Sequence, residues 1–111
     1  MEKREIKFRA WNKKDSNLKD RMIQQATITN NGLVVMPDGD EWDIPLMQYT
    51  GLKDKEGKEC FEGDKVGSGV VVWQEFDARF VIEGKNWEQP MSFIKRLEVI
   101  GNIYENKELL K

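Results

Sequence analysis

Apolar and polar residues alternate in short runs along this chain, and small or polar turn residues separate the runs. The first run is residues 5–11, in which Ile6, Phe8 and Ala10 fall on one face, while charged side chains and Trp11 fall on the other. Alternation with a period of two is typical of a strand that buries one face. We therefore expect a half-buried strand near the start of the chain.

Strong turn sequences predict two hairpins. Asn30-Asn31-Gly32 separates the extended runs 27–29 and 33–36, which is the arrangement of a β-hairpin. Residues 53–57 form a charged turn between two further extended runs, and Gly57 can supply the left-handed backbone position that such a turn needs.

Two further glycine turns are expected to be structural. Thr50 precedes Gly51, and we expect its hydroxyl to bond to nearby backbone, although Tyr49 and Thr50 could instead line a binding groove. In the turn that follows, Gly63 permits a positive φ and Asp64 can accept a hydrogen bond from nearby amides. An acid-base role for the carboxylates of this turn is the weaker interpretation, because no partner for a cleft is evident.

The second half of the chain is richest in strand signals. Residues 62–104 contain about five extended pieces, among them the β-prone run 70–73 and the run 79–83, which can pair across a turn. Many short strands separated by turns predict a mainly β fold with little helix. We expect a small SH3-like barrel at about residues 62–104 and an N-terminal hairpin or sheet layer in residues 1–50, within a single domain 1–111 that can be subdivided at residue 50.

Composition changes the functional picture more than the fold. The 111 residues include no histidine, which removes the commonest general base and metal ligand, and the single cysteine, Cys60, excludes an intrachain disulfide. No apolar run approaches the roughly 20 residues that a membrane helix needs. We expect a protein of the reducing cytoplasm that is not an enzyme and has no membrane association.

Three segments form a recognisable set: Phe8 to Trp11, the run from Gln48 to Asp54 with the turn from Phe61 to Asp64 after it, and the closing run Glu98 to Asn106. In their order and spacing they resemble the YopX-like family of proteins of bacteriophages and prophages. The resemblance implies a phage or prophage source, a β-rich fold and an intracellular role without a known activity. It carries over no site residues and no cofactor.

Charge is distributed unevenly, and this suggests one candidate contact surface. Residues 1–21 hold eight Lys or Arg and four Asp or Glu, although the whole chain has a net charge of −2. Trp11 shares a strand face with Lys7 and Arg9, an arrangement that can stack a single-stranded base and hold its phosphates. Packing of Trp11 between subunits or under the following loop is the preferred interpretation. Trp73 lies in an apolar run and is expected in the core.

A second candidate is the acidic stretch 37–43, which we expect to be a loop. It holds four carboxylates in six residues, the oxygen ligands that a hard cation prefers: Asp38, Asp40, Glu41 and Asp43. Their spacing is not that of an EF-hand loop, and a solvated turn is favoured. Cys60 has no histidine partner and lies among carboxylates, so it is expected to be buried and structural.

These observations favour a small, non-enzymatic phage accessory protein that binds a host or phage protein and forms homo-oligomers through sheet edges or opposed charges. Nucleic-acid binding through Lys7, Arg9 and Trp11 is the alternative. A hydrolase with metal ligands in the acidic stretch is the third hypothesis. The expected cofactor set is empty.

Overall fold

A computed structural model describes residues 5–12 and 21–105 of the chain. The loop expected after residue 12 lies largely outside these described residues. The chain divides into two compact units, one comprising Ile6–Gln48 and the other running from Tyr49 onward and including Glu5. The division falls close to the subdivision expected at residue 50.

The first unit is built around β1 (Phe8–Asn12), which lies between two antiparallel neighbours. It pairs with β2 (Arg21–Ile23) on one side and with the start of β6 (Leu46–Lys53) on the other, Ala10 lying opposite Ile23 and Leu46. As a central strand, β1 can hydrogen-bond through its backbone to a neighbour on each side, and its three middle residues are buried.

A small three-stranded sheet completes this unit. It consists of β3 (Thr27–Ile28), β4 (Val34–Val35) and β5 (Glu41–Trp42), in that order. The hairpin expected around Asn30–Gly32 is confirmed, since Ile28 pairs with Val34. The expectation of a loop over residues 37–43 is partly wrong, because Trp42 pairs with Val34 and makes the end of that stretch a strand. A buried partner strand thus overrides the acidic composition.

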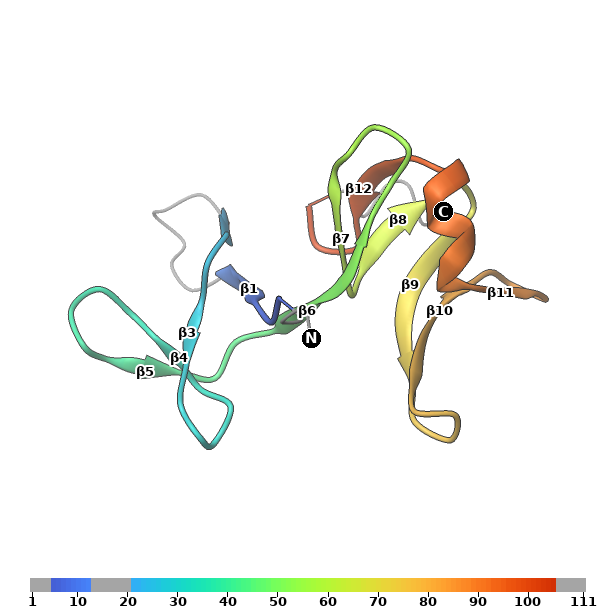
Figure 1. Cartoon of the computed structure of the whole chain (residues 1–111). Helices are drawn as coiled ribbons and strands as arrows, with labels where there is room; N and C mark the ends of the chain where they lie inside the picture. The colour runs from blue at the N-terminus through green and yellow to red at the C-terminus, as the bar shows by residue number, and fades with distance from the viewer. Residues whose placement is uncertain (1–4, 13–20, 106–111) are drawn as a thin grey trace. The chain divides into compact units, whose positions relative to one another are not determined.

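The second unit contains a hairpin and a larger sheet (Figure 1). The end of β6 pairs with β7 (Glu59–Phe61) across the turn that contains Gly57. Five antiparallel strands then form a curled sheet in the order β11-β10-β9-β8-β12. Their bounds are Asp64–Val66 for β8, Gly69–Gln74 for β9, Arg79–Glu83 for β10, Glu88–Pro90 for β11 and Val99–Asn102 for β12.

The mainly β class is confirmed, with a curled sheet compatible with a small barrel over the region where five strands were expected. Met91–Arg96 forms a short 3-10 helix, η1. Within the described residues, no helix is long and apolar enough to cross a membrane. The core of the second unit is formed by side chains of β7 to β10, η1 and β12: Cys60, Val66, Val71, Ile82, Met91, Ile94 and Val99.

Two expectations about burial are wrong. Ile6, expected on the buried face of the first strand, is 67% exposed, because β1 begins only at Phe8. Trp73, expected in the core, is 44% exposed. It follows Val71 and Val72 on β9, but it lies toward the turn, where the sheet extends past the residues that cover its core face.

Candidate functional site

The hairpin formed by β9 and β10 carries a group of aromatic side chains near its turn, and we call residues 69–83 the aromatic hairpin. Trp73 pairs with Phe80 across the two strands. Their rings meet edge to face, with centroids 5.0 Å apart and an interplanar angle of 67°. Edge-to-face contact is a favourable aromatic geometry. Figure 1 shows β9 and β10 running on to a turn beyond the other strands of their sheet, and Trp73 with Phe80 is the second residue pair from that turn.

Phe76 lies in the turn itself and is the most exposed large apolar side chain among the described residues. Its side chain is 83% exposed, compared with 44% for Trp73. Leaving an aromatic ring in water forgoes about 1.5–3 kcal/mol of burial. Phe76 and Trp73 lie three residues apart at the same end of the hairpin, and two exposed aromatic side chains there make this end a candidate contact surface.

Two more features at this end of the hairpin, one in the turn and one at the end of β9, are unfavourable for folding. Ala78 has a φ of 52°, and among the described residues it is the one non-glycine with a positive φ. Gln74 is buried; its Nε2 donates to Glu88 Oε2 at 2.6 Å, but its Oε1 has no hydrogen-bond partner. A left-handed alanine and a buried unsatisfied oxygen each cost about 1–3 kcal/mol. Such departures from folding rules concentrate at functional sites.

Charges of both signs flank Phe76 in this turn. Arg79 Nε lies 3.3 Å from Asp77 Oδ2, and both side chains are close to half exposed. An exposed ion pair of this kind contributes little to stability, and each partner remains available to a second molecule. The aromatic hairpin thus offers an apolar centre with a polar rim, which is the usual composition of a protein-binding surface.

The sequence-predicted contact surface does not exist in the expected form. Arg9 and Trp11, expected beside Lys7 on an exposed strand face, are each only 6% exposed. Arg9 Nε donates to Met47 Sδ at 3.4 Å, and the Trp11 backbone N–H donates to the Pro45 carbonyl at 3.0 Å. The expectation of an exposed face is wrong, since Arg9 and Trp11 are nearly as buried as Ala10 on the opposite face of β1.

The acidic stretch forms the β4–β5 connection. Asp38 Oδ1 accepts a hydrogen bond of 3.0 Å from the Asp40 backbone N–H, which is an Asx turn. The carboxylate of Asp43 lies beyond the end of β5. Across the part of the chain that the structure describes, no three acidic or thiol side chains gather closely enough to hold a metal ion.

The turns around β6 and β7 use their polar side chains internally. Thr50 Oγ1 donates to the Cys60 carbonyl at 2.8 Å and accepts from the Leu52 backbone N–H at 3.3 Å. Gly51 has a φ of 90° and coincides with a shift of register between β6 and β7. Tyr49 is buried against Phe61, with ring centroids 5.4 Å apart. This arrangement serves packing and leaves no groove at Tyr49.

The turn before β8 is equally structural. Gly63 has a φ of 88°, and its backbone N–H donates to the Val71 carbonyl at 2.8 Å. Asp64 is 1% exposed, and its Oδ2 accepts from the Phe61 backbone N–H at 2.8 Å. Cys60 is fully buried in the core of its unit.

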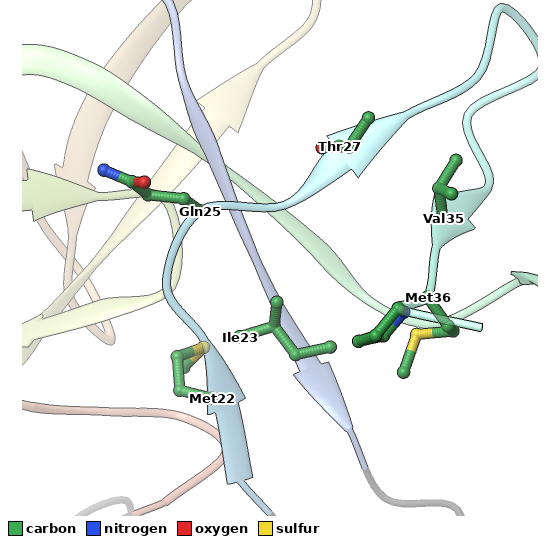
Figure 2. A pocket seen from close by; sticks show the side chains of 7 residues that line it. Met22, Ile23, Gln25, Thr27, Val35 and Met36 are labelled. Atoms are coloured by element: carbon green, nitrogen blue, oxygen red, sulfur yellow. The ribbon is translucent and has the colours of Figure 1, made fainter. Parts of the chain in front are cut away.

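The first unit contains one pocket of note, with a volume of about 490 Å³. Figure 2 shows Ile23 of β2 and Met36, which follows β4, flanking it. Gln25 and Thr27 supply the polar part of its lining. Its size suits a small ligand, but none of its lining side chains is ionisable, so it offers no group for acid-base chemistry.

Tyr104 and Asp54 have shifted pKa values, and both shifts have structural causes. Burial raises the pKa of Tyr104, and the nearby charge of Glu62 raises it further. Burial alone would also raise the pKa of Asp54, but backbone N–H donors, that of Val99 foremost, outweigh it and hold the pKa below its ordinary value. Neither group lies on the aromatic hairpin.

Sequence reasoning identified the turn of the aromatic hairpin but not its role. Residues 75–78 read as a simple connection between two strands, and Trp73 as a core residue. The available signal was Phe76, a large aromatic residue inside a turn of otherwise polar and small residues. Turns lie on the surface and carry function more often than strands do, so an aromatic residue there marks a contact.

Comparisons with known proteins place this chain in context. A family model described as YopX protein matches residues 7–111. The crystal structure of protein EF1440 from Enterococcus faecalis is similar to this chain, with a TM-score of 0.71 and 29% sequence identity over 96% of this chain and 98% of that chain. A comparison with curated proteins finds no match.

Proposed function

This chain belongs to the YopX family, and on that premise we propose that it is a phage or prophage accessory protein that binds another protein and catalyses no reaction. The aromatic hairpin is the surface that carries the proposal. The phage or prophage source and the bacterial cytoplasm as its place of action are part of this proposal, and the family resemblance of its sequence supports them.

The observation that supports protein binding is the exposure of Phe76 beside the Trp73–Phe80 pair. Aromatic residues with a surrounding polar rim are enriched at the centres of protein interfaces, where they contribute most of the binding energy. The left-handed backbone at Ala78 holds the turn that presents Phe76. A strained backbone at Ala78 is explained if the turn must keep this shape in order to present Phe76 to a partner.

The alternative, nucleic-acid binding through Lys7, Arg9 and Trp11, is disfavoured by burial. Base stacking requires an accessible ring, and Trp11 is 6% exposed. Arg9 is buried to the same degree and hydrogen-bonds to Met47, so it is not presented to a phosphate.

The test is capture of partners from a lysate of host cells that carry the phage, with and without nuclease. The wild-type protein is compared with Phe76→Ser and with the matched control Phe93→Ser, which removes a phenylalanine that is 39% exposed on η1. We expect Phe76→Ser to lose partners that the wild type and the control retain, with or without nuclease. Equal capture by all three proteins, or capture that nuclease abolishes, would contradict the proposal.

A further inference from the structure

We propose that the aromatic hairpin binds the aromatic hairpin of a second copy of this chain, in a two-fold symmetric, reversible dimer. The inference rests on the proposed function and names the first partner of that surface. A two-fold contact requires a surface that is complementary to itself, because the same residues meet from both sides.

The charges of the turn meet this requirement. Asp77 and Arg79 carry opposite charges two residues apart, directly after Phe76, and both are exposed. When two such turns approach about a two-fold axis, Asp77 of one copy can face Arg79 of the other, and the reciprocal pair forms at the same time. The two ion pairs within the separate chains, at 3.3 Å each, are then exchanged for two between the chains, so these charges fix the orientation of the two turns and add no further pair.

The apolar side chains set the strength of the contact. Aromatic side chains bury about 150–250 Å² each, so the exposed parts of Phe76 and Trp73 offer roughly 250 Å² per copy. A stable interface buries about 800 Å² per partner. Glu75 also leaves each turn with one unbalanced negative charge. We therefore expect a weak dimer that forms with rising concentration, not an obligate one.

The sheet edges of the same unit are less suited to self-association. β11 is an edge strand of three residues that ends in Pro90, which has no backbone N–H to donate to a neighbouring strand. β12, at the other edge, has four residues and a register irregularity. Short and irregular edges discourage pairing with another chain. Compared with these two edges, the aromatic hairpin is the better suited to self-association.

The experiment is sedimentation velocity over a concentration series up to roughly 1 mM, with charge reversals in the turn. Asp77→Arg gives a turn with two positive charges, and Arg79→Asp gives a turn with an excess of negative charges. Each variant alone should dimerise more weakly than the wild type, on the order of tenfold or more, because like charges then face each other.

An equimolar mixture of Asp77→Arg and Arg79→Asp should recover association, because each turn then meets its opposite. Phe76→Ser should also weaken the dimer, while Phe93→Ser should not. Near-ultraviolet circular dichroism and the melting temperature of each variant show that it is folded, since these exposed positions lie outside the core.

Three outcomes would overturn the inference: a strictly monomeric wild type over the whole series, a dimer that Phe76→Ser leaves unchanged, or a mixture of the two charge variants that does not recover. If the protein is monomeric but Phe76→Ser still loses a partner from the lysate, this inference fails and the proposed function stands.

Discussion

The backbone N–H of Val99 donates a hydrogen bond of 2.8 Å to Oδ2 of Asp54, which lies 45 residues earlier in the chain. The other carboxylate oxygen of Asp54 accepts from the backbone N–H groups of Glu56 and Lys58, at 2.9 Å each. One buried carboxylate therefore shapes the β6–β7 turn and attaches it to β12. The Lys55 backbone N–H adds a second connection to this region, donating to the Leu97 carbonyl at 2.9 Å.

Replacing this carboxylate by an amide should destabilise the protein. In Asp54→Asn the remaining oxygen can still accept within the turn, but the amide nitrogen cannot accept from Val99 and leaves a buried N–H unsatisfied. We expect the free energy of unfolding to fall by about 1–3 kcal/mol, measured by urea unfolding. Asp77→Asn, at an exposed position, is the control and should change it by a few tenths of a kcal/mol at most. Equal stability of the two variants would contradict the assignment.

The same carboxylate should make stability depend on pH in a definite direction. Because its donors hold the pKa of Asp54 below its ordinary value, the ionised form stabilises the folded state above the unfolded pKa of about 3.9. That contribution is lost as the pH falls through the lower, folded-state pKa. The difference in unfolding free energy between the wild type and Asp54→Asn should therefore be constant near neutral pH and shrink below about pH 4. Parallel pH curves for the two proteins would count against it.

The hairpins of this fold could be predicted because their signals are local. Gly57 has a φ of 81° and Gly32 a φ of 80°, and a glycine in a polar turn between two apolar runs indicates such a backbone without tertiary information. The burial of Asp54 could not be predicted in this way. Its turn is highly charged in sequence and reads as solvated, and only the contact with Val99 explains why the side chain is buried.

The sequence pattern also could not predict which face of a strand is exposed. Alternating polar and apolar residues predict a strand with one face exposed to solvent. β1 is instead a central strand in which Arg9 and Trp11 are buried as well as Ala10. The opposite error occurred at Trp73, where a strongly apolar run predicted burial. Exposure there depends on how far the hairpin extends beyond the core, and this is set by neighbouring strands that are distant in sequence. The aromatic hairpin is exposed because of this extension, and the sequence pattern therefore did not identify it as a candidate site.

Close approach of Trp87 to the backbone gives a third prediction. A Cβ atom added at Gly84 would lie 2.1 Å from the indole of Trp87, and one added at Gly69 would lie 2.8 Å from the same ring. Gly84→Ala should displace the indole and lower the unfolding free energy by about 1–3 kcal/mol. In a Trp87→Leu background the same substitution should cost clearly less, because the clash is gone. A double-mutant cycle measures this coupling, and additive effects would refute it.

The turn at Gly63 tests whether its left-handed backbone is essential to the second unit. Gly63 has a φ of 88°; its N–H donates to the Val71 carbonyl at 2.8 Å, and its own carbonyl accepts from the Ile103 backbone N–H at 3.0 Å. A β-branched residue adopts this conformation poorly. Gly63→Val should therefore cost about 1–3 kcal/mol in strain and more through the two hydrogen bonds. Gly57→Val is the comparison, since that glycine is equally left-handed, a Cβ there meets no atom within 4 Å, and its N–H donates within its own turn, to the Asp54 carbonyl. We expect Gly63→Val to lower the melting temperature further than Gly57→Val does. An unchanged melting temperature in Gly63→Val would show that the turn can adopt another backbone conformation without loss of stability.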